Sequence, residues 1–418
     1  MEFKMKLKLN LLFFFLAFIT ACSSGDDNDN DDNGGNDNFT VQPYDPVSVT
    51  KTNAMQLYAH YMPWFETPET NNGKWGQHWT MANKDPNKVG ANGKREIAAH
   101  FYPLIGPYAS GDADVIEYHL LLMKYSGIDG VLIDWYGTRD YYDYAANSRN
   151  TEAFIKGADK IGLKYAIVYE DQTLRDGLEE SAKVTQARAD MRYLETTFFN
   201  RNNYIKINGK PLLLTFGPQE IKKPADWTSI FSVLSTKPVF LPLYGHSDAA
   251  NNASSTNAQG EFIWVDAASM ETKYDAVGRF DIWMGGAYPG FKGYYKDGGW
   301  GNNPLNDIDH ENGALLKRLL QMAKDRNAEH LQLITWNDFG EGTIIEPTQE
   351  FGYKFLTEIQ AFAGTSYSQS VLTSVLDFYN LRKEPGKDEL TKKKLEQIYY
   401  YFISLQADKA QELINELK

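Results

Sequence analysis

Short apolar runs alternate with amphipathic helical patterns along most of this chain, and the alternation predicts an α/β fold with a parallel sheet. Eight runs have the length and composition of buried strands, and eight βα units favour closure into a (β/α)8 TIM barrel. The length of 418 residues fits one such barrel with short additions. The expected strands are 54–60, 130–135, 165–170, 211–216, 238–244, 262–265, 280–284 and 330–336.

Amphipathic helices are expected between the strands. One of them follows Asp112, a residue type that caps helix N-termini by accepting hydrogen bonds from backbone N–H groups. Apolar residues recur at helical spacing in each segment, so that one face can be buried against the sheet. The clearest helical segments are 114–125, 179–199 and 313–327.

The first residues have the pattern of a targeting segment. Lysines at positions 4, 6 and 8 precede an apolar run over 11–19, which is short for a permanent membrane span. The run leads into Ala21-Cys22, which resembles a bacterial lipoprotein cleavage box, so lipidation is expected at Cys22. Cys22 is the single cysteine of the chain, which excludes an intramolecular disulfide and a multi-cysteine metal site.

Residues 23–38 consist of Ser, Gly, Asp and Asn alone, and such a segment cannot bury apolar surface. It resembles the acidic export signal of bacterial surface lipoproteins. Together with Cys22 it predicts a protein of the cell envelope, lipid-anchored to the outer membrane and exposed at the surface. The pattern after Gly364 is mostly helical, with a break at Pro385-Gly386. The expected organisation is a signal peptide over 1–22, a disordered acidic tether over 23–45, a barrel over 46–365 and a C-terminal helical extension over 366–418.

The composition narrows the class of partner. A formal net charge of −13 disfavours nucleic acid, because phosphates would be repelled. An aromatic content of 14% has two explanations. One is a Tyr-rich core and surface. The other is carbohydrate binding, since apolar sugar faces pack on aromatic rings. We expect a monomer.

Acids and aromatic residues collect where the expected strands end. In a barrel the carboxyl ends of parallel strands meet at one rim, where active sites are built. One buried acid is more often a structural hydrogen-bonding partner, but repetition at six strand ends is hard to explain by packing. These strand ends are 60–64, 134–136, 169–172, 244–246, 285–291 and 336–341.

The segment 335–347 after the last expected strand is the most informative. It reads Thr-Trp-Asn-Asp-Phe-Gly-Glu-Gly-Thr-Ile-Ile-Glu-Pro and places Asp338 and Glu341 three residues apart, beside aromatic and amide groups. Two carboxylates in such surroundings are what cleavage of a glycosidic bond requires. Gly340 and Gly342 flank Glu341 and would allow a tight loop that directs the acid inward.

Together with three other stretches, this segment resembles glycoside hydrolase family 99, the endo-α-mannosidases and endo-α-mannanases, and the related family 71 of α-1,3-glucanases. The other stretches are 58–65 with 76–79, 102–108 and 127–137. The resemblance spans roughly 55–363 and does not decide between the two families. It implies a barrel, an α-linked polysaccharide or oligosaccharide as partner, no cofactor, and a glycoside hydrolase that is endo-acting on α-mannan or a related glycan.

The resemblance assigns general acid/base chemistry to Glu341, which must be protonated before reaction. Asp338 is expected to be its partner. Family 99 has Glu at that position and family 71 has Asp, whereas the continuation through Glu346-Pro347 follows family 99. Retention or inversion of the anomeric configuration stays open. Glu170 resembles the family 99 glutamate at the end of the third strand, with a salt bridge or a hydrogen-bonded supporting acid as the alternative.

Further residues are candidates for substrate binding, although each of the aromatic ones could equally be core. The polar candidates are His60, His78, Asp134, His246, Asn337 and Glu346, and the aromatic candidates are Tyr61, Trp64, Trp79, Trp135, Tyr136, Tyr169, Tyr244, Tyr288, Phe291 and Trp336. No metal is expected, because no histidine pair has close ligand spacing and no acid–histidine motif accompanies them. The glycines at 285–286 and 298–301 lack the residues of a phosphate loop and are expected to form a flexible flap over the cleft.

Three alternatives stay open. The same barrel could be a catalytically weak or inactive surface glycan-binding lipoprotein. Asp338 supports this alternative, because family 99 has Glu at that position. The barrel could also be an α-1,3-glucanase, or a structural surface lipoprotein. The acids and aromatic residues at the strand ends disfavour the structural lipoprotein.

Overall fold

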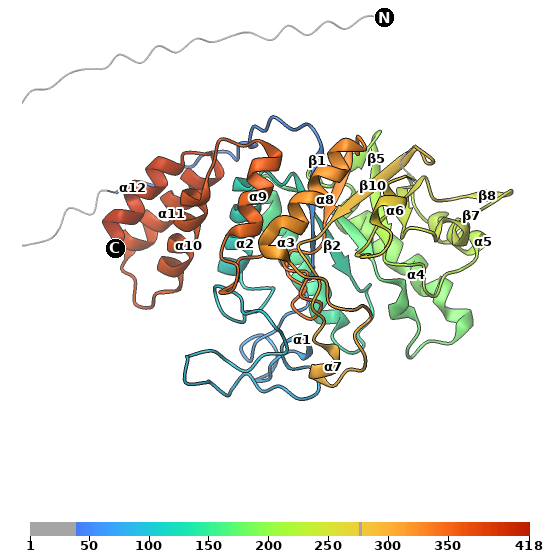
Figure 1. The fold of residues 1–418 in the computed structure, drawn as a ribbon, viewed down its shortest axis with the longest axis horizontal. Coiled ribbons are helices and arrows are strands. Elements are labelled where there is room, and N and C mark those ends of the chain that lie inside the picture. The colour runs from blue at the N-terminus through green and yellow to red at the C-terminus, as the bar shows by residue number, and fades with distance from the viewer. Residues whose placement is uncertain (1–38, 276–277) are drawn as a thin grey trace, which may run out of the picture. The chain divides into compact units, whose positions relative to one another are not determined.

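The computed structural model describes residues 39–275 and 278–418 (Figure 1). The expected signal peptide, Cys22 and residues 23–38 of the expected tether lie outside the described residues. Residues 39–47 run beside the C-terminal helices, where Gln42 exchanges two hydrogen bonds with Gln397. In the described part of the chain no helix is long and apolar enough to cross a membrane.

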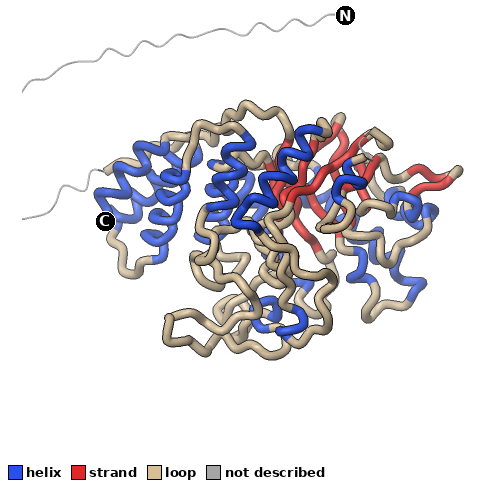
Figure 2. The backbone as a smooth tube through the Cα atoms, in the orientation of Figure 1, coloured by secondary structure: helices blue, strands red, loops and turns tan. Residues whose placement is uncertain are grey.

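The core of the fold is a parallel sheet (Figure 2). Its strands pair in the order β6-β5-β3-β2-β1-β11-β10-β9, so the first and last βα units meet in the middle of the sheet. Each of the eight expected strands has a counterpart within a few residues of the expected range. They are β1 Gln56–Tyr61, β2 Gly130–Trp135, β3 Lys164–Tyr169, β5 Lys210–Thr215, β6 Val239–Pro242, β9 Gly260–Phe262, β10 Ile282–Ala287 and β11 His330–Leu333. Three two-residue strands, β4 Lys206–Ile207, β7 Asn251–Asn252 and β8 Ser255–Thr256, were not predicted.

The sheet is strongly curled, and its two edges approach each other. Two isolated parallel bridges, Phe240 with Ala258 and Leu243 with Phe262, link the β6 region to the β9 region. The backbone N–H of Tyr244 also donates to the carbonyl of Phe262 over 2.8 Å. A continuous ladder of the kind that joins the other strands is not formed between β6 and β9 in the described residues. The architecture is therefore TIM-barrel-like, which confirms the predicted α/β fold with a parallel sheet, and closure into a (β/α)8 barrel stays a prediction.

Helices cover the sheet (Figure 1). The Asp112 carboxylate accepts hydrogen bonds from the backbone N–H groups of Asp114 and Val115, so the predicted cap is confirmed. The helix expected over 179–199 is α-helical only to Leu194, and Glu195–Phe199 is a π turn. The longer helices are α2 Ala113–Tyr125, α3 Tyr144–Ile161, α4 Glu180–Leu194, α5 Pro224–Phe231, α8 Ala314–Asp325 and α9 Lys354–Ala363, and the short ones are α1 Gln77–Thr80, α6 Met270–Tyr274 and α7 Tyr295–Gly298.

The C-terminal segment is helical, as expected, and packs on α2 (Figure 1). It consists of α10 Gln369–Lys383, α11 Glu389–Ile403 and α12 Ala407–Leu417. The predicted break at Pro385-Gly386 separates α10 from α11, whereas the second break, at 404–406, was not predicted. The Tyr125 hydroxyl donates to the carbonyl of Phe402 over 2.9 Å, and Arg382 donates to both carboxylate oxygens of Glu117.

The prediction of a flap at Gly285-Gly286 is wrong, because both glycines are buried within β10. A Cβ atom on Gly286 would lie 2.9 Å from Ile334 Cδ1 and 3.0 Å from Ile263 Cγ1, so the close approach of neighbouring strands requires glycine there. The second glycine group, 298–301, does lie at the end of α7 in a loop beside the cleft described below.

We expect Gly286→Ala to destabilise the protein by about 1–3 kcal/mol, because the added methyl overpacks a buried strand. The free energy of unfolding by urea would measure the change. Gly90→Ala is a suitable control, since the nearest atom to its Cβ belongs to the side chain of exposed Asn92, which can move aside. Equal stability of Gly286→Ala and wild type would contradict the packing argument.

Candidate active site

A cleft opens at the carboxyl ends of the strands and holds about 730 Å³, part of it open to solvent. Its walls come from the ends of strands β1, β2 and β3 and from the segment that follows β11. The lining residues are His60, Met62, Trp64, Phe65, His78, Met81, Asp134, Tyr136, Glu170, Gln172, Phe216, Trp264, Tyr295, Trp300, Asp338, Gly340 and Glu341.

The loop after β11 folds back on itself and thereby directs two acids into the cleft. The Thr335 hydroxyl accepts a hydrogen bond from the backbone N–H of Asp338 over 2.8 Å. The N–H of Gly342 donates to the carbonyl of Asp338 over 2.9 Å, in a turn where Gly342 has φ +64°. Glycine adopts this left-handed conformation without steric cost, which explains its place immediately after Glu341.

Asp338 is buried, and its carboxylate accepts the backbone N–H of Glu341 over 2.8 Å. Burial raises the pKa of Asp338 to about 6, and the N–H bonds of Glu341 and Gly340 together with nearby His78 act in the opposite direction. Asp338 therefore titrates close to neutral pH and is mostly ionised above it.

Glu341 lies beside Asp338 in the same cleft, and its Oε2 atom is buried without a hydrogen-bond partner. Burial raises the pKa of Glu341 well above its usual range, and the charge on Asp338 raises it further, while Trp264 acts against both. The two carboxyls thus differ in proton affinity, with Glu341 the more readily protonated. Two acids with separated pKa values are the usual requirement for paired acid and base roles.

Asp134 and Glu170 form a second buried acid pair on the wall made by β2 and β3. Burial raises the pKa of Glu170 well above its usual range, and the neighbouring Asp134 and Asp171 add to this. Burial likewise raises the pKa of Asp134, with an opposing effect of hydrogen bonding to Glu170 and a further increase from Asp338. Both oxygens of Asp134 and Oε2 of Glu170 lack other hydrogen-bond partners in the described residues. The pair therefore favours the state in which one proton is shared.

We expect Asp134→Asn to stabilise the protein by on the order of 1 kcal/mol at pH 7, because the amide stays uncharged on burial, whereas the acid pair must take up a proton when the protein folds. The pKa of a buried carboxyl is raised here, so its unfavourable effect is absent below about pH 4 and grows as pH rises. Thermal melting of variant and wild type at both pH values tests the sign. Asp140→Asn, in an exposed position, is the control. A gain equal at both pH values would contradict the charge argument.

An aromatic wall faces the acids. The ring of Trp64 stacks on that of His78 with centroids 4.2 Å apart and planes 4° apart, and His78 Nε2 lies 3.1 Å from an Asp143 oxygen. His60 contacts Gln332 Oε1 through Nδ1 over 2.9 Å. Burial lowers the pKa of His60 to about 4, so its ring is neutral at pH 7. The wall combines flat apolar surface with neutral polar edges, which suits a sugar.

Several polar atoms of the cleft lack partners within the described residues. Buried polar groups are almost always hydrogen-bonded, so a concentration of unpaired ones in a cleft indicates groups reserved for a ligand. These atoms are Trp64 Nε1, both carboxylate oxygens of Asp134, Glu170 Oε2 and Glu341 Oε2. An indole donor and several carboxyl oxygens, which donate or accept according to their protonation, match the hydroxyl groups of a carbohydrate.

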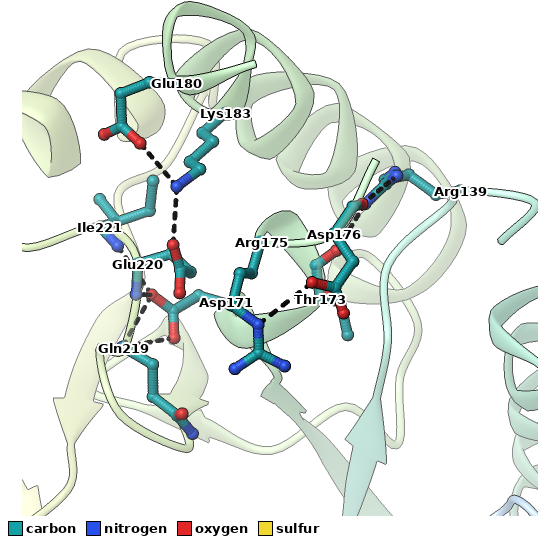
Figure 3. Close-up of polar contacts among 10 residues, drawn as sticks. All are labelled: Arg139, Asp171, Thr173, Arg175, Asp176, Glu180, Lys183, Gln219, Glu220 and Ile221. Atoms are coloured by element: carbon teal, nitrogen blue, oxygen red, sulfur yellow. Dashed lines mark hydrogen bonds and ion pairs between the residues drawn. The ribbon is translucent and has the colours of Figure 1, made fainter. Parts of the chain in front are cut away.

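The loop that carries Glu170 and Gln172 is held from two sides (Figure 3). Asp171 lies between them in the sequence and is not among the residues that line the cleft. Its carboxylate accepts hydrogen bonds from the backbone N–H groups of Gln219, Glu220 and Ile221 at 2.8–3.0 Å. Arg139 donates to the carbonyls of Thr173 and Asp176. These contacts fix the direction of Glu170.

Eight of the predicted site residues line the cleft: Glu341, Asp338, Glu170, Asp134, His60, Trp64, His78 and Tyr136. The other predicted residues do not, because their side chains have protein partners elsewhere. Asn337 bonds both backbone groups of Met62, and Glu346 accepts from the Tyr108 hydroxyl over 2.6 Å and lies 3.3 Å from His119. Tyr61 joins the same buried group through His119.

The remaining predicted residues outside the cleft are aromatic, apart from His246. The indole of Trp79 donates to the Tyr108 carbonyl, and that of Trp135 to Ser148. Most of the others are core residues, and His246 lines a separate surface hollow with Lys222 and Asp248. The remaining aromatic residues are the following: Trp336 packs against His119, Tyr169 bonds Asp190, Tyr288 bonds the Asp266 carbonyl, Tyr244 packs against Trp283, and Phe291 is buried.

Nine lining residues were not predicted as site residues: Met62, Phe65, Met81, Gln172, Phe216, Trp264, Tyr295, Trp300 and Gly340. Some signals were present. Met62, Phe65 and Gln172 stand within or beside the predicted strand ends, and Trp300 stands in the second glycine group. Trp264 was assigned to the interior of a strand, but β9 ends at Phe262, which places Trp264 at the rim. Among the described residues, no group of three potential ligands could hold a metal ion.

A TIM-barrel-like sheet with buried acids and an aromatic wall at its strand ends is compatible with glycosidic-bond chemistry. The model of glycosyl hydrolase family 99 matches residues 52–244, which run from β1 to β6 and include Asp134 and Glu170. Over this region the chain is similar to glycosyl hydrolase family 99, as its sequence motifs indicated.

Similarity is also found to named relatives. The glycoprotein endo-alpha-1,2-mannosidase of Xenopus laevis is 25% identical over 262 residues, which cover 58% of this chain and 51% of that protein. The chain thus spans about half the length of this relative. A glycoprotein endo-alpha-1,2-mannosidase-like protein of Homo sapiens is 22% identical over 69% of this chain and 68% of its own.

Among solved structures, the family 99 endo-alpha-mannosidase of Bacteroides thetaiotaomicron superposes with a TM-score of 0.58 and 18% identity. The superposition covers 79% of this chain and 99% of that one. It shows a shared fold that extends past the region matched by the family model.

Proposed function

We propose that the protein hydrolyses α-glycosidic bonds within a mannose polysaccharide, in an endo manner. The observation that carries this proposal is the pairing of buried Asp338 with half-buried Glu341, two acids of unlike pKa in a cleft with unpaired polar atoms. The substrate class is supported by the names of the relatives, which are endo-alpha-mannosidases of the same family.

In the proposed reaction Glu341 is the general acid. Its raised pKa keeps the proton on the carboxyl until the glycosidic oxygen is bound. As the bond from the anomeric carbon to that oxygen breaks, Glu341 transfers its proton to the leaving oxygen. The resulting carboxylate then accepts a proton from the water that completes hydrolysis, which restores the starting state.

Asp338 is the proposed base. Being mostly ionised above pH 6, it can accept a proton from the sugar hydroxyl that attacks the anomeric carbon in the first step. When water displaces that oxygen in the second step, Asp338 returns the proton to it. The shared proton of Asp134 and Glu170 leaves both an acceptor and a donor for sugar hydroxyls. Trp64 and Tyr136 supply the apolar surface on which the ring of the sugar packs.

A product screen tests this function. Full-length protein and its Glu341→Gln variant would be incubated with yeast α-mannan, α-1,3-glucan and several plant and bacterial polysaccharides. We expect oligosaccharides from α-mannan that are absent with the variant. Products from α-1,3-glucan alone would transfer the assignment to that activity. Binding of α-mannan with no products from any glycan would favour a non-catalytic glycan-binding protein.

We further propose that the curled sheet is a closed (β/α)8 barrel. The two isolated bridges and the Tyr244–Phe262 hydrogen bond between β6 and β9 support closure. We propose that this barrel spans residues 46–365 and that the protein is a monomer. Sedimentation of the protein would report the oligomeric state.

We also propose that Cys22 carries a lipid anchor, on the basis of the lipoprotein-like box that ends at this residue. A tethered hydrolase at the outer membrane would keep released oligosaccharides close to the cell. Metabolic labelling with palmitate tests the anchor. Wild type should be labelled and membrane-bound, and Cys22→Ser should be neither. Labelling of the serine variant would contradict the assignment.

A further inference from the structure

The loop between β2 and α3 carries a group of tyrosines beyond the wall of the cleft. We propose that Tyr141 and Tyr142 form a second carbohydrate-binding site, a platform for sugar units of a long polysaccharide that extend out of the cleft. This inference rests on the proposed function, because it deepens the description of the substrate from a short glycan to a polymer. It assigns a ligand to residues that the proposed reaction does not use.

Most of Tyr142 is open to solvent, and its ring packs on two other tyrosines, Tyr141 and Tyr144. The Tyr142 side chain is 68% exposed, the highest value among the exposed large apolar side chains of the described residues. Its backbone has φ +47°, in the left-handed region that bulky residues disfavour. Glycine or asparagine would fit this backbone better and would expose no ring to water. An exposed aromatic ring held on a strained backbone is typical of a functional position.

The loop is continuous with the wall of the cleft on both sides of Tyr142. The ring of Tyr142 lies 6.0 Å from that of Tyr144, which in turn lies 5.3 Å from the lining residue Tyr136. Between them, Asp143 contacts His78, whose ring stacks on Trp64 inside the cleft. A glycan bound on the wall would therefore meet Tyr142 as its next aromatic surface outside the cleft.

Tyr141 is held in place by its surroundings. Its ring lies over the Arg139 guanidinium, 5.0 Å from the ring centroid, and Arg139 is fixed by the carbonyls of Thr173 and Asp176 (Figure 3). A Cβ atom on Gly177 would lie 3.0 Å from the Tyr141 ring, so the glycine lets the ring pack on the loop after β3. The rings of Tyr141 and Tyr142 are 4.2 Å apart. Little conformational freedom would be lost when a ligand binds, at least at Tyr141.

The chemistry of the platform indicates a neutral glycan. Aromatic faces bind the C–H side of a pyranose ring, and phenol hydroxyls can bond its edges. Exposed Asp140 stands on the same loop and can accept hydrogen bonds from sugar hydroxyls. Asp143 and Asp176 add negative charge, although their carboxylates already pair with His78 and Arg175. The same charges would repel anionic polysaccharides.

Tyr142→Gly tests the platform without straining the fold, since glycine suits the left-handed backbone. Affinity would be measured for yeast α-mannan and for a short α-mannobiose ligand, with full-length protein that also carries Glu341→Gln to prevent turnover. We expect about tenfold weaker binding of α-mannan and unchanged binding of α-mannobiose, because only the polymer reaches the platform. Tyr141→Ala should have a similar effect. Tyr44→Gly removes another exposed tyrosine, next to Tyr401 and remote in sequence from the loop, and is the matched control.

The outcomes separate this inference from the proposed function. Unchanged affinity of Tyr142→Gly and Tyr141→Ala for α-mannan would overturn the platform, while cleavage of α-mannan by wild type would leave the proposed function intact. Equal weakening for α-mannan and α-mannobiose would also overturn it, because the loss would then lie in the cleft. If wild type cleaves no α-mannan and Glu341→Gln binds none, the proposed function fails and the platform fails with it.

Discussion

Glu341→Gln is expected to lower kcat on α-mannan by about 10³- to 10⁴-fold, because it removes the proton that the leaving oxygen requires. Glutamine has nearly the same shape and no negative charge, and Glu341 is expected to be protonated before reaction. The cleft should therefore keep its form and its affinity. Steady-state kinetics together with binding measurements on the same variant would show a loss in kcat without a matching loss in affinity.

Glu350→Gln is the control for Glu341→Gln. It is the same substitution in the chain segment after the same strand, at an exposed glutamate that pairs with Lys94 over 3.3 Å. We expect wild-type kinetics for this control. A Glu341→Gln variant with more than about a tenth of wild-type kcat would exclude Glu341 as the general acid.

Asp338→Asn is expected to lower kcat by about 10²- to 10⁴-fold and also to change the shape of the pH–rate profile. In wild type the rate should rise through pH 6 as Asp338 ionises and fall at higher pH as Glu341 loses its proton. The variant has no group to ionise at position 338, so the rise should disappear. Loss of the neighbouring negative charge should lower the pKa of Glu341 and move the alkaline fall to lower pH.

The residual activity of Asp338→Asn, measured from pH 4 to 9, tests both signs. Asp297→Asn, a solvent-exposed acid on α7, should leave the profile unchanged. A rise near pH 6 that persists in Asp338→Asn would mean that another group controls the acidic limb. An alkaline limb that does not move would mean that Asp338 does not act on Glu341.

The strands could be predicted because each has a strong local pattern. The run over 130–135 is apolar apart from Asp134, which marks its functional end, and β2 has the same bounds. Four acids of the cleft could be predicted for the same reason, because side chains at the ends of parallel strands converge on one rim. They are Asp134, Glu170, Asp338 and Glu341. The cap at Asp112 could also be predicted, because it depends only on neighbouring residues.

The remaining contacts could not be predicted because they depend on partners distant in the sequence. Asn337 and Glu346 follow a catalytic-type motif, yet their side chains are used by Met62 and Tyr108, more than two hundred residues earlier. Strand ends were uncertain by a few residues, and in β9 that difference decides whether Trp264 is core or rim. The buried glycines of β10 were mistaken for a flap because close packing between strands leaves no local signal.

The most direct test of the account is the hydrolysis of α-mannan by full-length wild type and Glu341→Gln side by side, with products resolved by size during the reaction. We predict oligosaccharides of intermediate length early in the wild-type reaction and none with the variant. Wild type that releases no oligosaccharide, or a variant that releases them at the wild-type rate, would contradict the claim that Glu341 in this cleft cleaves α-mannose glycans.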